Sequence, residues 1–150
     1  MKVVLQRVRS SSVLIDQSER RSIGEGMTVL LGITEGDSQD DIDWLVRKMI
    51  NMRIYPDDAG VMNRSILETG GSFLVISQFT LHASTKKGNR PSYIRSAAPT
   101  ISKPLYEIFL ETLEKESGLE VQKGEFGADM LVEIQNDGPV TIIMDTEDKK

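Results

Sequence analysis

The stretch Met130–Asp145, MLVEIQNDGPVTIIMD, carries the strongest local indication of the fold. It predicts two strands, Met130–Gln135 and Val140–Asp145, joined by Asn136-Asp137-Gly138-Pro139. Asp-Gly between two apolar runs favours a tight hairpin turn, and proline, which has no N–H to donate, belongs at a strand start, an edge or a bulge. At the other end of the chain, Lys2–Arg9 alternates with the period of a strand, and Ser12–Gln17 is predicted to be its hairpin partner. Hairpins at both ends favour antiparallel sheets.

The interior adds further strands and two helices. Strands are predicted for Met27–Ile33, for the short segment Arg53–Tyr55 and for Ser72–Leu81. One helix follows a cap at Asp37 or Ser38, with its apolar side chains at helical spacing from Ile42 to Ile50. The other covers Ser102–Ser117 and ends at Gly118. The sum is an α+β fold of roughly seven mostly antiparallel strands with two outer helices. Its exposed sheet edges need cover, which dimerisation can provide.

Composition favours a single soluble domain. The chain has 150 residues, 39% of them hydrophobic, and no cysteine, which excludes disulfides, thiol nucleophiles and thiolate metal sites. No apolar run is long enough for a signal peptide or a membrane span. We therefore expect one domain over residues 1–150 in the cytoplasm, with no membrane association and with a frayed tail at 146–150.

The net charge of −5 argues against a protein that wraps a long nucleic acid. A local basic patch could still hold a short terminus, and the candidates are Lys86, Lys87 and Arg90 in one loop, with Arg7 and Arg9 near the start. On charge alone, a solvated loop is the simpler interpretation.

Familiar catalytic systems are missing from the sequence. The only histidine is His82, which directly follows a predicted strand and is better explained by a surface or loop-packing role than by base catalysis. There is no Gly-x-Ser-x-Gly elbow and no phosphate-binding loop. One histidine without cysteine makes a zinc site a poor hypothesis, so we expect neither metal nor cofactor.

Two segments place polar residues where chemistry could occur. Ser77-Gln78-Phe79-Thr80-Leu81 ends an apolar strand, and a strand end can offer backbone N–H groups and a hydroxyl to a ligand. Asn136-Asp137-Gly138-Pro139-Val140-Thr141 contains the Gly-Pro pair. The alternative for the first is a strand that turns to solvent, and for the second a plain hairpin. An X-Pro bond can be cis or trans, and the sequence does not decide between them.

These two segments resemble the two signatures of the D-aminoacyl-tRNA deacylase family, also called D-tyrosyl-tRNA deacylases. Other blocks resemble the family in the expected order, and the resemblance covers essentially the whole chain: Gln6-Arg7-Val8, Gly32, Met62-Asn63-Arg64-Ser65 and Lys87-Gly88-Asn89-Arg90-Pro91-Ser92. It implies a homodimer of β-barrel-like subunits with the site at the interface. It also implies chiral proofreading in translation by hydrolysis of the ester between a D-amino acid and the acceptor end of a tRNA.

The resemblance assigns roles to individual residues. Gly138-Pro139 would form a cis dipeptide that faces the partner subunit's active site and excludes L-amino acids, with Arg7 as its support. Glycine has no side chain to reject, so glycyl-tRNA would also enter. Backbone N–H groups near Phe79 and Thr80 would stabilise the oxyanion, and Gln78 and Phe79 would shape a pocket for the terminal adenosine, next to Ser77.

The nucleophile stays open between Thr80 and a water molecule. No base for Thr80 is evident, so water assisted by the 2′-hydroxyl of the tRNA is favoured. Two other functions also stay open. One is a dimeric module that binds RNA ends without chemistry, and the other is a hydrolase of small esters or amides that uses Thr80 with His82.

Overall fold

Strand β1 (Lys2–Ile15) organises the sheet. The computed structural model describes residues 1–149, and in it β1 pairs along its length with the C-terminal strand β8 (Met130–Asp145). Its other edge pairs first with β3 (Gly26–Gly32) and then with β2 (Glu19–Ile23). All three pairings are antiparallel. One long strand therefore connects segments from the beginning and the end of the chain.

Both predicted terminal hairpins are wrong in detail. Ser12–Gln17 is not a partner of Lys2–Arg9, because β1 runs on without a break and turns only at Asp16 and Gln17, whose φ angles are 47° and 59°. Likewise, Asn136–Pro139 is not a hairpin turn but an irregular part of the continuous strand β8. The register between β1 and β8 shifts on both sides of Val8, opposite this part. The extra residues are thus absorbed as bulges inside one ladder.

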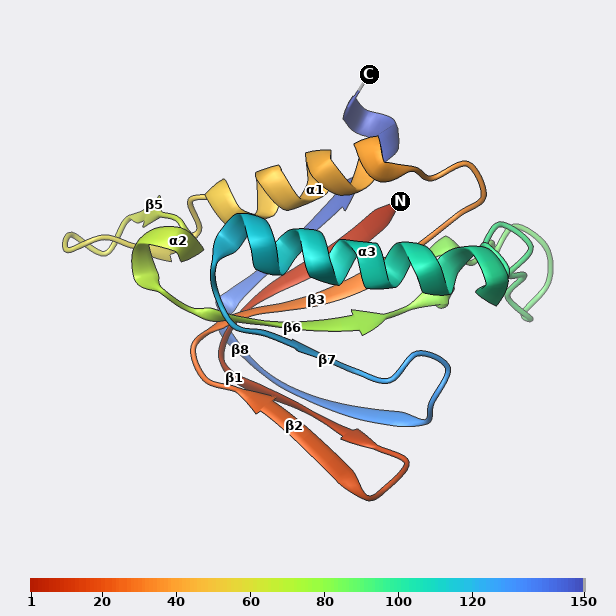
Figure 1. The fold of residues 1–150 in the computed structure, drawn as a ribbon, viewed down its shortest axis with the longest axis horizontal. Helices are drawn as coiled ribbons and strands as arrows, with labels where there is room; N and C mark the ends of the chain where they lie inside the picture. The colour runs from red at the N-terminus through yellow and green to blue at the C-terminus, as the bar shows by residue number, and fades with distance from the viewer. Residues whose placement is uncertain (150) are drawn as a thin grey trace.

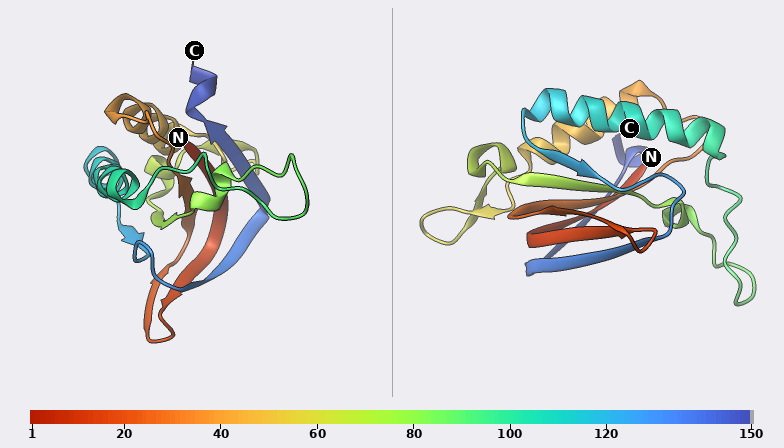
Figure 2. Two further views of the ribbon diagram at one scale, coloured as in Figure 1. Left: turned by 90° about the vertical axis from the view of Figure 1, so that its right-hand side faces the viewer. Right: turned by 60° about the horizontal axis from the view of Figure 1, so that its bottom comes forward.

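The second half of the sheet is parallel, which the sequence did not predict. Strand β6 (Ser72–Ser77) lies parallel to β3, and β7 (Val121–Lys123) lies parallel to β6. Arg21 of β2 donates from Nη1 to the carbonyl oxygens of Lys123 (2.9 Å) and Gly124 (3.2 Å), which connects the two ends of the sheet. The sheet therefore curls into the nearly closed shape visible in Figures 1 and 2. A separate small hairpin is made by β4 (Tyr55–Pro56) and β5 (Met62–Arg64).

Two helices cover one face of the sheet, as predicted. Helix α1 (Gln39–Asn51) begins at Ser38, where Ser38 and Asp41 form a capping box, and α3 (Pro99–Ser117) ends at Gly118, whose φ is 65°. They lie side by side over the sheet (Figure 1). The main core between helices and sheet is fully buried and includes Leu45, Met49, Val29, Phe73, Phe109 and Leu113. The α+β class with a mostly antiparallel, barrel-like sheet and outer helices is confirmed, with one additional short helix, α2 (Ile66–Thr69).

The C-terminal segment that follows β8 contacts the start of the chain and helix α1. Thr146–Lys149 forms a 3₁₀ turn (η2). The Thr146 amide donates to the Met1 carbonyl oxygen at 2.9 Å, and Lys149 Nζ lies 2.6 Å from Asp41 Oδ1. Lys150 lies outside the described residues. Among residues 1–149, no helix is both long and apolar enough to cross a membrane.

Candidate functional site

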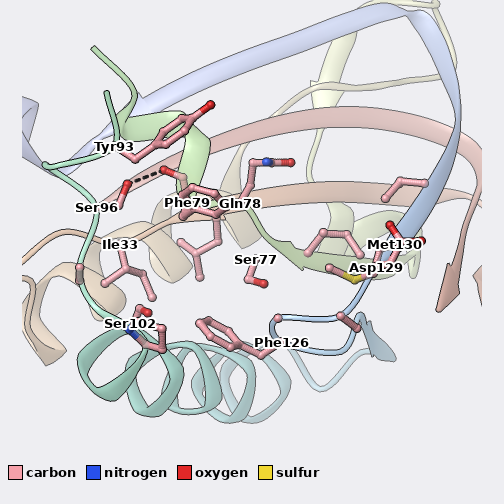
Figure 3. A pocket seen from close by; sticks show the side chains of 17 residues that line it. Ile33, Ser77, Gln78, Phe79, Tyr93, Ser96, Ser102, Phe126, Asp129 and Met130 are labelled. Atoms are coloured by element: carbon pink, nitrogen blue, oxygen red, sulfur yellow. Dashed lines mark hydrogen bonds between the residues drawn. The ribbon is translucent and has the colours of Figure 1, made fainter. Parts of the chain in front are cut away.

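A pocket of about 650 Å³ opens between the end of β6, the segment before α3, and the segment before β8 (Figure 3). Its walls are mainly apolar, with a few hydroxyl and amide groups. The lining residues that matter below are Ile33, Ser77, Gln78, Phe79, Tyr93, Ser96, Ser102, Phe126, Asp129 and Met130. A volume of this size suits a nucleoside-sized ligand, and mixed apolar and polar walls are typical of small-molecule sites.

The 3₁₀ turn η1 (Phe79–His82) contains Phe79 and Thr80, two of the predicted site residues, and leaves two backbone donors free. The predicted strand Ser72–Leu81 is wrong beyond Ser77, because the chain turns into η1 after the Gln78 amide makes a last bond to β3, to Leu31 O at 2.7 Å. The Leu81 amide makes the first bond of the turn, to Gln78 O at 3.2 Å. Within residues 1–149, the amides of Phe79 and Thr80 therefore have no hydrogen-bond acceptor. The start of a tight turn leaves such N–H groups available to a ligand.

Side-chain contacts fix the geometry of this turn. Gln78 Nε2 donates to Thr80 Oγ1 at 2.5 Å, and Ser96 Oγ donates to Phe79 O at 2.8 Å, as Figure 3 shows for the second bond. The Phe79 ring meets Tyr93 edge-on, with ring centroids 5.1 Å apart. The turn is thus held from both sides.

Gly32 at the end of β3 lets the turn approach the sheet closely. A Cβ built on Gly32 would lie 3.0 Å from His82 Cδ2, 3.0 Å from Leu81 Cβ and 3.1 Å from Gln78 O. Contacts this short require the neighbour to move, so a larger residue here would push the turn away from the sheet.

His82 is a buried packing residue, as the sequence favoured. It is 5% exposed, and neither ring nitrogen has a hydrogen-bond partner among the described residues. Burial lowers the pKa of His82 below its ordinary value. His82 makes no hydrogen bond to Thr80 within residues 1–149, so the Thr80–His82 hydrolase has no geometric support.

The buried His82 predicts a loss of stability in acid. Because burial lowers its pKa, the folded chain protonates this histidine at a lower pH than the unfolded chain does, so the unfolded state binds more protons as the pH falls below about 6.5. The free energy of unfolding should therefore fall as the pH is lowered from about 7.5 to about 5.5 on account of this group. Urea unfolding of the wild type and of His82→Leu at both pH values measures it. An equal fall in both proteins would exclude His82 as the cause.

A second cluster joins Arg7 of β1 to the irregular part of β8. Arg7 Nε donates to Asp137 O at 2.9 Å, and Nη1 donates to Ile54 O at 2.6 Å. The Gly138–Pro139 bond is cis, and Gly138 has a φ of 136°, which favours glycine. A Cβ on Gly138 would lie 2.9 Å from Val140 Cγ2 and 3.1 Å from Arg7 Nη2. The guanidinium group and the glycine therefore pack directly together.

Within β8, polar side chains span the Gly138–Pro139 pair. Asn136 Oδ1 accepts from the Val140 amide at 2.7 Å, and Asn136 Nδ2 donates to Thr141 Oγ1 at 3.0 Å. The side chain of Asn136 thus replaces the ladder partners that the irregular backbone gives up. Gly138 and Pro139 remain exposed and do not line the pocket of their own chain.

The three predicted RNA-binding cations lie in one exposed loop. Ser84 and Ser92 close this loop through two backbone hydrogen bonds of 2.8 and 2.9 Å. Lys86, Lys87 and Arg90 are exposed, and none forms an ion pair with a described residue. The loop directly follows η1 in the chain, and its three cations have no carboxylate partner among the described residues.

Sequence reasoning missed most of the pocket wall. Tyr93, Ser96, Ser102, Phe126 and Asp129 lie outside both signatures. The only available signal was that Phe126 is an isolated aromatic residue next to Gly127, in a stretch without strand periodicity. Within residues 1–149, no group of three His, Cys, Asp or Glu side chains gathers closely enough to hold a metal ion.

Comparisons with known proteins cover almost the whole chain. A family model described as D-Tyr-tRNA(Tyr) deacylase matches residues 4–145. Proteins named D-aminoacyl-tRNA deacylase from Bacteroides thetaiotaomicron and Parabacteroides distasonis are 61% and 53% identical over 150 residues, which is all of each chain.

Solved structures agree with the fold. One described as a c-Myc DNA Unwinding Element Binding Protein superposes with a TM-score of 0.90 at 39% identity, over 97% of this chain and 99% of the other. A probable eukaryotic D-amino acid tRNA deacylase superposes with a TM-score of 0.82 over 95% and 97% of the two chains, and at 17% identity it supports the fold alone. With a family model over residues 4–145 and full-length relatives at 53–61% identity, the chain belongs to the D-aminoacyl-tRNA deacylase family.

Proposed function

We propose that this protein hydrolyses the ester bond of D-aminoacyl-tRNA, releasing the D-amino acid and the tRNA, and that it also accepts glycyl-tRNA. The observation that carries the proposal is the turn η1 beside the pocket, where the Phe79 and Thr80 amides have no acceptor within residues 1–149. Fixed N–H groups that meet a developing oxyanion are the largest single contribution to many acyl-transfer reactions. Such a substrate places the enzyme in the cytoplasm, where tRNA is charged.

The pocket suits the terminal adenosine of the tRNA. Its walls offer the ring of Phe126 and the apolar side chains of Ile33 and Met130 to a base, and the polar groups of Ser77 and Gln78 to a ribose. An adenosine held there would place the ester, which is attached to its ribose, next to the Phe79–Thr80 amides. Backbone N–H groups would then stabilise the oxyanion, and the reaction would need no charged side chain for that purpose.

We infer that chirality is selected by Gly138–Pro139 of a partner subunit. These residues are exposed and lie outside the pocket of their own chain, while Arg7 holds the preceding carbonyl in place. A homodimer would let each exposed loop complete the pocket of the other subunit, and main-chain atoms would then exclude an L side chain while glycine passes. Sedimentation at assay concentration tests the dimer, and a fully active monomer would exclude this arrangement.

Thr80 is poorly placed to be the nucleophile. Its Oγ1 already accepts a hydrogen bond from Gln78 Nε2, which draws electron density away from the oxygen, and no described residue accepts its proton as a base. Water, helped by the 2′-hydroxyl of the tRNA beside the ester, is the nucleophile we favour.

Thr80→Ala is accordingly expected to keep deacylation within about tenfold of the wild-type rate, whereas loss of a true nucleophile costs about 10⁴-fold or more. Single-turnover hydrolysis of D-tyrosyl-tRNA measures the difference. Abolished activity, together with an acyl-threonine trapped by acid quench in the wild type, would overturn the water mechanism.

We call the exposed loop between Ser84 and Ser92 the cationic loop. It is expected to contribute to the affinity for RNA and not to the preference for D over L substrates. Replacing Lys86, Lys87 and Arg90 by glutamine should weaken tRNA binding and reduce the slope of log affinity against log salt by about one for each phosphate that is no longer neutralised. The ratio of D to L activity should stay constant. If the salt slope equals that of the wild type, the loop is only a solvated surface.

The decisive assay compares matched D- and L-tyrosyl-tRNA and glycyl-tRNA. Hydrolysis of the D and glycyl esters with little hydrolysis of the L ester supports the proposal. Absence of any turnover would favour a module that binds RNA ends, and turnover without chiral preference would favour a general esterase.

A further inference from the structure

Large apolar side chains are exposed next to the pocket mouth. Phe79 is 56% exposed, Tyr93 is 43% exposed and Ile94 is 89% exposed. Phe79 and Tyr93 already contact each other edge-on, and Figure 3 shows both at the same side of the pocket. We call Tyr93 and Ile94 the 93–94 platform. Ile94 does not line the pocket, so its exposure is not explained by the adenosine site.

The cationic loop is fixed next to this platform. The Ser84–Ser92 bridge returns the chain to its starting point immediately before Tyr93. After the platform, Ser96 Oγ donates to Phe79 O at 2.8 Å and the Ala97 amide donates to Ile33 O at 3.0 Å. These two bonds connect the segment to the turn η1 and to the residue that follows β3. Apolar surface and positive charge are therefore held together at one side of the pocket.

We propose that the 93–94 platform and the cationic loop bind the unpaired 3′ end of the RNA substrate. The bases that precede the terminal adenosine would stack on Tyr93 and pack against Ile94, and their phosphates would follow Lys86, Lys87 and Arg90. This rests on the proposed function, because an adenosine in the pocket fixes where the preceding nucleotides must lie.

The chemistry of the surface selects a single strand. Base faces are available for stacking only when bases are unpaired, and aromatic side chains beside a positively charged groove are the usual design for single-stranded nucleic acid. A chain with a net charge of −5 is a poor binder of a long duplex, but a short strand needs only the few local cations. The same cations, free of carboxylate partners among the described residues, also favour a polyanion over another acidic protein surface.

The test compares two substrates that differ only beyond the adenosine. One is D-tyrosyl-tRNA, and the other is the D-tyrosyl ester of adenosine alone. For each protein we take the ratio of kcat/KM on the first to kcat/KM on the second. Ile94→Asp should lower this ratio about tenfold because it removes a stacking surface and adds a repelling charge. Ile94→Trp should keep or raise it, since an aromatic ring stacks better.

Val61→Ala is the matched control. Val61 is 59% exposed and belongs to the segment between β4 and β5, which lies at the opposite end of the molecule from the cationic loop (Figures 1 and 2). It should leave the ratio unchanged. A ratio for Ile94→Asp equal to that of Val61→Ala would overturn the proposal. An unchanged ratio for Ile94→Asp together with a loss of the dimer in sedimentation would also overturn it, because the platform would then be a contact surface for a second copy of the chain.

A binding measurement separates this inference from the proposed function. A fluorescent RNA hairpin with an unpaired 3′-ACCA tail should bind the wild type more tightly than the blunt hairpin, and Ile94→Asp should lose that difference. If the wild type hydrolyses neither ester, the proposed function fails. The binding measurement still shows whether the 93–94 platform binds an unpaired 3′ end. Equal affinity for tailed and blunt hairpins would refute it.

Discussion

Gly138→Ala is expected to lose about 10²-fold in the hydrolysis of D-aminoacyl-tRNA while the protein stays folded. The φ of 136° disfavours any residue with a Cβ, and the added methyl group would meet Val140 Cγ2 at 2.9 Å and Arg7 Nη2 at 3.1 Å. The loop must therefore shift, and a displacement of about 1 Å at a substrate-positioning group can cost 10²-fold in rate. Single-turnover assays with D- and L-tyrosyl-tRNA measure both the rate and the chiral preference.

Gly24→Ala is the matched control for this change. A Cβ on Gly24 has no neighbour within 4 Å, and its φ lies outside the left-handed region. It should behave as the wild type does. Wild-type rate and chiral preference in Gly138→Ala would show that this loop takes no part in catalysis or selection.

Arg7→Met is expected to give the second large effect. Methionine fills much of the same volume but leaves the carbonyl groups of Ile54 and Asp137 without the donors that Arg7 supplies. Losing a charged donor to a partly buried carbonyl costs about 1–3 kcal/mol of stability. The loop before Gly138 also loses its anchor, so deacylation should fall about tenfold or more.

Arg9 provides a close comparison. It also lies in β1 and reaches the same residue, with Nε 3.4 Å from Asp137 Oδ1, but its side chain is 74% exposed. Arg9→Met should therefore change stability by no more than about 0.5 kcal/mol. Urea unfolding and the deacylation assay on both variants test this. Equal effects of the two substitutions would mean that charge near Asp137, and not the Arg7 hydrogen bonds, supports the loop.

The sequence predicted the helices and the apolar strand β3 well because their signals are local. Helix α1 has its cap at Ser38 and its apolar residues at helical spacing, and α3 has Gly118 at its end. These features act within a few residues of one another, so periodicity and capping chemistry are sufficient to find them.

The same local rules failed where distant partners decide the structure. Asn136-Asp137-Gly138 has the composition of a hairpin turn, but pairing with β1 on both sides keeps β8 extended, and Asn136 spans the irregular part with its own side chain. The parallel pairs of β6 with β3 and β7 have no counterpart in local periodicity. The strand ends at Ser77 because the chain turns into η1, where the Leu81 amide donates to Gln78 O, and no sequence pattern predicts this turn.

The candidate site divides in the same way. Ser77 to Thr80 and Gly138–Pro139 were proposed from their signatures, and Arg7 was proposed as a support for the second. Tyr93, Ser96 and Phe126 were missed, because they meet only after α3 and the parallel strands are in place. A pocket assembled from separate segments is visible only in three dimensions.

The position of β1 between β3 and β8 has a consequence for synthesis on the ribosome. Arg7 lies 130 residues before Asp137, whose carbonyl it binds. The edge of β1 that pairs with β8 therefore stays unpaired until almost all of the chain has been made. An unpaired strand edge on a growing chain can pair with non-native strands, and native pairings between distant segments form slowly. Arg7 can form its hydrogen bond to the Asp137 carbonyl only when translation of the chain is nearly finished. The nascent protein therefore lacks this anchored loop until its last strand, β8, has emerged from the ribosome.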